Sequence, residues 1–72
     1  MSVHHRRPRS KNGTNEPRNI SNVSDKKHRA FHLIFSNWTP YQIAHELNTT
    51  WIDPDFEFIV QRKSGRRYME ET

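Results

Sequence analysis

The sequence contains no cysteine and no apolar run longer than three residues. The absence of cysteine excludes disulfide bonds and thiolate zinc clusters. The short apolar runs exclude a transmembrane helix, because a helix needs about 20 apolar residues to span a bilayer. The N-terminal segment is charged and has no apolar stretch behind it, unlike a secretory signal. We therefore expect a soluble, cytoplasmic protein that does not contact a membrane.

Hydrophobic residues are also scarce, at 31% of a chain of 72 residues. A single domain of this size buries little apolar surface, so such domains usually need an additional constraint. Because cysteine is absent, the five histidines are the candidates for a metal site that supplies this constraint.

Positive charge is concentrated in the first half of the chain. Residues 1–31 carry eight basic and two acidic side chains, whereas residues 32–72 carry four basic and six acidic ones. This segregation favours a nucleic acid as the partner of the basic half, although a disordered basic arm would have the same composition. The acidic half is a candidate surface for a protein partner, or simply a solvated polar face. Its candidate residues are Glu46, Asp53, Asp55 and Glu57.

Turn, cap and periodicity signals predict an α+β fold in one domain over residues 1–62, followed by a flexible tail over 63–72. Asn12-Gly13 marks a turn, and Ser24 and Thr39 are favourable N-cap residues. The predicted elements are a strand over 2–7, a loop over 8–18, a strand over 19–23, a helix over 25–36, a helix over 40–48 and a strand over 56–61. The predicted core consists of Phe31, Phe35, Trp38, Ile43, Leu47, Trp51, Phe56 and Phe58.

Four of the histidines have a spacing that suits a metal site. His28 and His32 are four residues apart on the first predicted helix, so both imidazoles project from one face. His4 and His5 lie in an extended segment, where neighbouring side chains point to opposite faces. One of them can therefore reach an ion while the other is free to act as a base. Two alternatives to a metal site are open. His28 and His32 are then ordinary residues on the polar face of the helix, and His4 and His5 are the remnant of an N-terminal tag.

The order of polar residues over 3–35 adds to this interpretation. The segment contains, in order, His4-His5, Pro8, Asn12-Gly13, Asn15, Asn19-Ile20 and His28-x3-His32. This order resembles the HNH endonuclease motif of the His-Me finger (ββα-metal) superfamily, and its colicin DNase branch in particular. The resemblance implies a strand–loop–strand–helix unit around one metal ion. The helix and strand predicted within 39–62 would support this unit.

The resemblance also implies a role for each matching residue. His4, His28 and His32 would be ligands of one divalent ion, with zinc, magnesium, manganese and nickel as candidates. His5 would be the general base that activates a water, and Asn19 would hold the loop and the base in place. Basic residues around the motif would contact phosphates of the nucleic acid, which is DNA by the resemblance. These residues are Arg6, Arg7, Arg9, Lys26, Lys27 and Arg29.

Two features depart from the family pattern. Arg6 stands where many members have an apolar residue, and the cysteines of the zinc knuckle are absent.

The first hypothesis is a hydrolase, namely a metal-dependent HNH endonuclease that cleaves phosphodiester bonds in DNA. The second is a non-catalytic module whose ion only stabilises the fold while the basic face binds nucleic acid or a partner, as in a small phage or mobile-element protein. The third is a small regulator that binds a partner through its acidic half.

Overall fold

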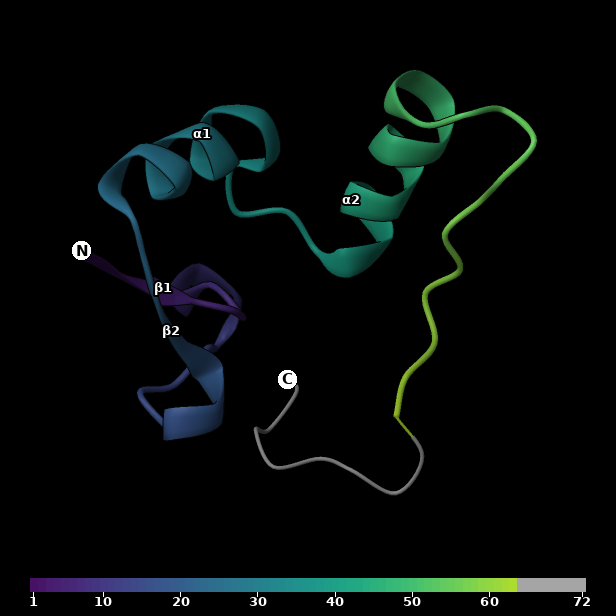
Figure 1. Ribbon diagram of the computed structural model, residues 1–72. Helices are drawn as coiled ribbons and strands as arrows, with labels where there is room; N and C mark the ends of the chain where they lie inside the picture. Colours follow the sequence, from purple (N-terminus) through teal and green to yellow (C-terminus); the bar gives the residue numbers. More distant parts are fainter. Residues whose placement is uncertain (64–72) are drawn as a thin grey trace.

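The computed structural model describes residues 1–63 and has an α+β fold (Figure 1). A two-stranded antiparallel hairpin is followed by two helices. The regular elements are β1 (Ser2–His5), β2 (Ile20–Val23), α1 (Asp25–Phe35) and α2 (Pro40–Glu46), with short 3₁₀ turns η1 (Arg9–Lys11) and η2 (Pro17–Asn19) and a π-helical turn η3 (Leu47–Trp51). Within the described residues, no helix has the length and apolar character needed to cross a bilayer.

The hairpin pairs β1 with β2 in a register that places His4 opposite Ser21 and His5 opposite Ile20. The prediction that the first strand continues to residue 7 is wrong, since β1 ends at His5. The backbone N–H of Arg7 donates to the side-chain oxygen of Asn19 at 2.7 Å, so a side chain replaces the next rung of the ladder. The first strand is therefore shorter than its sequence pattern indicates.

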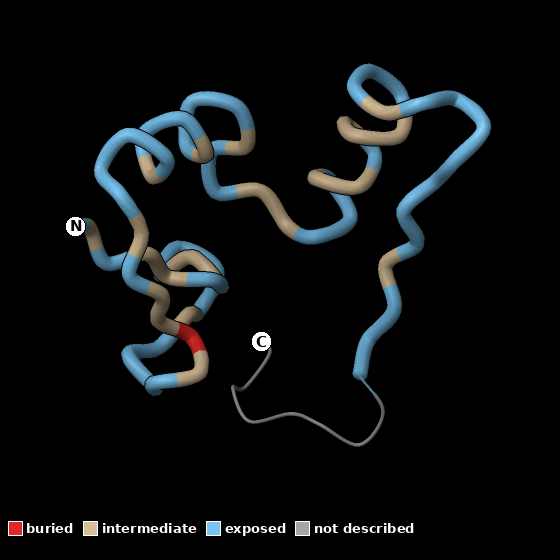
Figure 2. The backbone as a smooth tube through the Cα atoms, viewed as in Figure 1, coloured by how far each residue is buried: buried red, intermediate tan, exposed pale blue. Residues whose placement is uncertain are grey.

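Asn19 has the one fully buried side chain within residues 1–63, with an exposed fraction of 0% (Figure 2). Its Oδ1 accepts from Arg7 N–H, while its Nδ2 donates to the carbonyl oxygens of Thr14 at 2.7 Å and Arg7 at 3.2 Å. Because the amide satisfies backbone groups on both sides of the long connection, a polar residue organises the loop where larger domains use an apolar core.

Helix α1 begins where its cap signal predicts. The side-chain oxygen of Ser24 accepts from Lys27 N–H at 3.1 Å, and Asp25 lies in the first turn near the positive end of the helix dipole. The helix ends at Phe35, one residue before the predicted end, because Ser36 adopts a positive φ of 52°. Phe31, Phe35 and Trp38 then form a series of half-buried rings, with centroid separations of 5.1 and 6.2 Å.

Helix α2 begins with a complete capping box. Gln42 N–H donates to the Thr39 hydroxyl, and Thr39 N–H donates to the Gln42 side-chain oxygen at 2.9 Å. The α-helix ends at Glu46 rather than residue 48, and η3 continues the chain to Trp51. In Figure 1, α2 lies apart from the hairpin, beyond the linker that follows α1.

The predicted strand over 56–61 is wrong. Residues 52–63, here called the C-terminal arm, contain no regular element. The backbone of Phe58 is held instead by the side-chain amide of Asn48, whose Oδ1 accepts from Phe58 N–H at 2.8 Å and whose Nδ2 donates to Phe58 C=O at 2.9 Å. One side chain substitutes for a neighbouring strand at a single position, and no strand within residues 1–63 pairs with this segment.

Part of the predicted core is also wrong. Ile43 and Leu47 are half-buried, but Trp51, Phe56 and Phe58 are 61%, 70% and 55% exposed. The molecule is flat, with extents of 36 × 33 × 17 Å, and Figure 2 shows the C-terminal arm exposed along most of its length. Apart from Lys63, the predicted tail lies outside the described residues.

Candidate metal centre

The hairpin and α1 bring three histidines together. His4 on β1 makes edge contacts with the rings of Phe31 at 4.9 Å and His28 at 5.2 Å, and its ring lies 5.5 Å from that of His32. One nitrogen from each of the three imidazoles lies within 4.8 Å of the others. Three histidines from two elements are therefore close enough to hold one metal ion, as predicted for His4, His28 and His32.

The spacing of the two helical histidines suits a shared ion. Nε2 of His28 and Nε2 of His32 lie 3.1 Å apart. Two imidazole nitrogens bound to one zinc ion at about 2.0–2.1 Å in tetrahedral geometry lie about 3.3 Å apart. The helical pair therefore needs little rearrangement to occupy two adjacent coordination positions.

The third histidine carries an unsatisfied nitrogen. Nδ1 of His4 is buried and has no hydrogen-bond partner among residues 1–63. Burial lowers the pKa of His4, and the charges of His28 and His32 beside it lower this pKa further. Both effects favour the neutral imidazole, which is the form that binds metals. A buried, neutral nitrogen without a partner fits a metal ligand, because it otherwise loses its solvation without compensation.

His32 is oriented by an outer contact. Its Nδ1 lies 3.0 Å from the backbone carbonyl oxygen of Ser36, so Nδ1–H donates to that oxygen and Nε2 is left as the ligand atom. The carbonyl is presented by the turn that ends α1, in which Trp38 N–H donates to Phe35 C=O. Ser36 is not among the predicted site residues, because a serine after a helix does not by itself indicate a positive φ.

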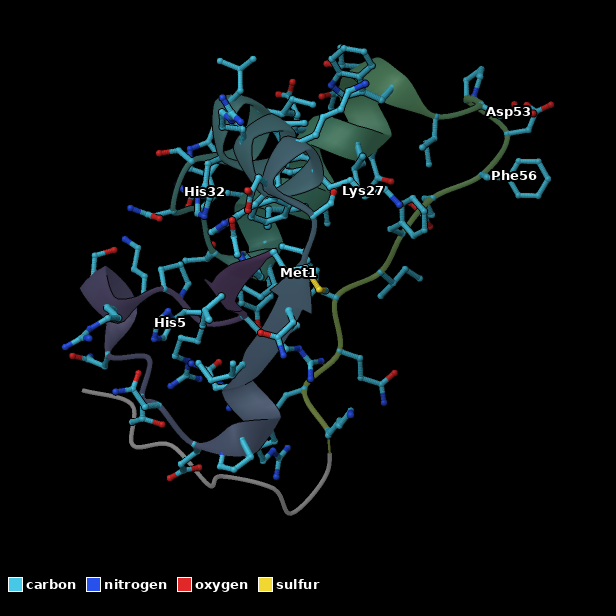
Figure 3. All side chains as sticks on the ribbon, turned by 60° about the vertical axis from the view of Figure 1, so that its left-hand side comes forward. Met1, His5, Lys27, His32, Asp53 and Phe56 are labelled. Atoms are coloured by element: carbon cyan, nitrogen blue, oxygen red, sulfur yellow. The ribbon has the colours of Figure 1, made fainter. Side chains whose placement is uncertain are left out.

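His5 is not part of this cluster and contacts a different partner. Its Nε2 lies 2.8 Å from Oδ1 of Asn15 in the loop between η1 and η2. Asn15 belongs to the predicted motif, but no role was predicted for it. Figure 3 shows His5 and His32 on the same side of the molecule, on β1 and α1 respectively.

An open pocket of about 280 Å³ joins the histidine pair of α1 to His5. It is lined by Val3, His5, Pro8, Arg9, Ser10, His28, His32 and Asn37. Of the six basic residues predicted to contact phosphate, Arg9 lines this pocket. Arg6 instead donates from its guanidinium to the backbone carbonyl of Arg18 at 3.0 Å, and Lys27 lies on the other side of α1 from His32 in Figure 3.

The acidic residues predicted to form a partner surface lie on and before the C-terminal arm. Glu46 accepts from the indole N–H of Trp51 at 3.0 Å, and the carboxylate of Asp53 accepts from Asp55 N–H at 2.9 Å. Asp53 and Phe56 lie far from His5 in Figure 3. A role for this segment in partner binding stays a prediction.

Comparisons with protein-family models, with curated proteins and with solved structures find no match to this chain.

Proposed function

We propose that this protein is a metal-dependent endonuclease of the HNH type that hydrolyses phosphodiester bonds in DNA. One observation carries the proposal: two members of the three-histidine cluster, His28 and His32, line the same pocket as His5, which is not part of the cluster. A metal ion that only stabilises the fold needs no additional histidine beside its pocket. A hydrolase needs a general base, because a water must lose a proton when it attacks, and such a histidine can supply it.

His4, His28 and His32 would hold the ion. When bound, the ion supplies electrophilic assistance, by neutralising charge that develops on the phosphate oxygens. Three imidazoles are a donor set that suits zinc or nickel, whereas magnesium prefers oxygen ligands. Manganese, which is commonly bound by carboxylate and carbonyl oxygens, is also less favoured by this donor set.

The chain's own residues would bind the substrate and accept the proton. Arg9 at the pocket would contact the phosphate, and the imidazole of His5 would accept the proton of the attacking water. Asn19 would act at a distance, because it holds the loop through Arg7 and Thr14 and does not line the pocket. The positive charge of residues 1–31 supports a nucleic acid as substrate, and the choice of DNA follows the motif resemblance.

A non-catalytic module is the second candidate, and a different observation favours it. Within residues 1–63 the one fully buried side chain is that of an asparagine, so the fold has little apolar core. An ion that joins β1 to α1 would compensate for this deficit even without catalysis. The basic face would then bind nucleic acid or a partner without cleaving it.

Nicking of supercoiled plasmid by the metal-stripped full chain, reconstituted separately with Zn²⁺, Ni²⁺, Mn²⁺ and Mg²⁺, tests the proposal. We expect metal-dependent nicking that is lost in His5→Ala and kept in His45→Ala, a matched control on the exposed surface of α2. Calorimetry on the same samples measures ion binding. Ion binding without nicking in the wild type would overturn the nuclease and leave the non-catalytic module.

A further inference from the structure

The contact between His5 and Asn15 defines which nitrogen of His5 is available. An amide oxygen has no hydrogen to donate, so Nε2 of His5 must be the donor in the 2.8 Å contact with Asn15 Oδ1. A neutral imidazole with its hydrogen on Nε2 carries its lone pair on Nδ1. Asn15 therefore selects one tautomer of His5 and leaves Nδ1 as the basic atom.

Both partners in this contact are held by Asn19. The carbonyl of Thr14, directly before Asn15, accepts from the Asn19 side chain at 2.7 Å, and the carbonyl of Glu16, directly after it, accepts from Asn19 N–H at 2.8 Å. On the other side, Arg6 N–H, directly after His5, donates to the Asn19 carbonyl at 2.7 Å. The chain segments that carry Asn15 and His5 are thus tied to one buried residue.

Gly13 allows the loop to close tightly before it reaches Asn15. A Cβ atom at this position would lie 1.8 Å from the carbonyl oxygen of Arg7, which is closer than any side chain can approach. The N–H of Gly13 donates to Pro8 C=O at 2.9 Å. The loop therefore returns close to the end of β1, which brings Asn15 within reach of His5.

We propose that Asn15 is a positioning residue: its side-chain oxygen holds Nε2–H of His5 and so directs the Nδ1 lone pair toward the attacking water. The inference rests on the proposed nuclease function and deepens it. In the step, the water oxygen forms a bond to phosphorus and its proton passes to Nδ1 of His5. The bond from phosphorus to the leaving sugar oxygen breaks, and that oxygen takes a proton from solvent.

Steady-state cleavage by Asn15→Ala and Asn15→Asp tests the positioning role. Asn15→Ala should lower kcat roughly 10- to 100-fold, as loss of an outer-shell partner typically does, with little change in KM. Asn15→Asp keeps an acceptor oxygen and should recover most of the rate. Asn22→Ala, the same chemical change at an exposed position of β2, should keep the wild-type rate. An unchanged kcat in Asn15→Ala, with wild-type nicking intact, would overturn the role and leave the nuclease in place.

A spectroscopic measurement tests the same inference without any cleavage. Long-range ¹H–¹⁵N correlation spectra of the metal-free wild-type chain should show His5 in the Nε2–H form, and Asn15→Ala should show a mixture of the two tautomers. If Asn15→Ala fails to fold, the wild-type spectrum alone tests the proposal. A dominant Nδ1–H form of His5 in the wild type would overturn it. If the wild type nicks no DNA, the nuclease fails, while the His5 tautomer still reports on the contact.

Discussion

The hairpin with α1 and the segment formed by α2 with the C-terminal arm differ in what holds them. In the first region, directional hydrogen bonds converge on the buried amide of Asn19, and three histidines join β1 to α1. In the second, the side-chain amide of Asn48 makes a similar pair of backbone contacts, but its surroundings are open and Trp51 and Phe56 face solvent. A polar contact organises a chain strongly only where water is excluded from it.

The largest expected difference in stability between the two regions is at their asparagines, Asn19 and Asn48. Asn19→Ala should lower the free energy of unfolding by about 3 kcal/mol, because the part-buried hydrogen bonds of its side chain to the backbone of Arg7 and Thr14 are all lost. Asn48→Ala should cost less than about 1 kcal/mol, since water can replace its bonds to Phe58. Urea denaturation followed by circular dichroism measures both. Equal losses would show that burial does not separate the two regions.

A metal ion should stabilise the first region selectively. At a free zinc concentration 100 times its Kd, an ion bound only by the folded chain raises the free energy of unfolding by about 2.7 kcal/mol. Hydrogen exchange should slow in β1 and α1 and stay unchanged in α2. His28→Ala should abolish the effect, and His45→Ala should keep it. Protection that extends equally into α2 would contradict the division into two regions.

The stability of the metal-free protein should rise with pH across the range in which His4 titrates. Burial and the neighbouring His28 and His32 lower the pKa of His4 in the folded state, so the unfolded chain binds more protons as the pH falls through about 6.5, the ordinary histidine value. The free energy of unfolding should therefore be larger at pH 7.5 than at pH 5. Urea titrations at both pH values measure this difference, and His4→Phe should reduce it. A larger difference in His4→Phe would contradict the assignment to His4.

The smallest expected effect lies at the junction of the two regions. Ser36 has φ 52° and ψ −129°, a conformation that glycine adopts more easily than serine. Ser36→Gly should therefore raise the free energy of unfolding on the order of 0.5 kcal/mol, because relief of left-handed strain exceeds the added chain entropy. The carbonyl that orients His32 is kept. Asn37→Gly, at a neighbouring residue without positive φ, should instead lower the free energy of unfolding. Thermal melts of both variants measure the two changes.

Local signals explain what could be predicted in advance. Ser24 and Thr39 cap their helices as expected, because a cap depends on contacts within three residues. The four-residue spacing of His28 and His32 likewise guarantees that their imidazoles meet on one face of α1. The prediction of a strand over 56–61 failed because alternation describes a segment suited to a sheet, whereas a strand also needs a partner strand, and the residues that the structure describes place none beside it.

The sequence by itself determined the helix starts, the histidine pair of α1 and the alternation that separates His4 from His5. These depend on backbone periodicity and on neighbours a few residues away. The tertiary structure decided that His4 meets that pair, that Asn15 reaches His5, and that Ser36 presents a carbonyl to His32. Such contacts depend on how a loop closes around one buried amide, and no local pattern encodes that path.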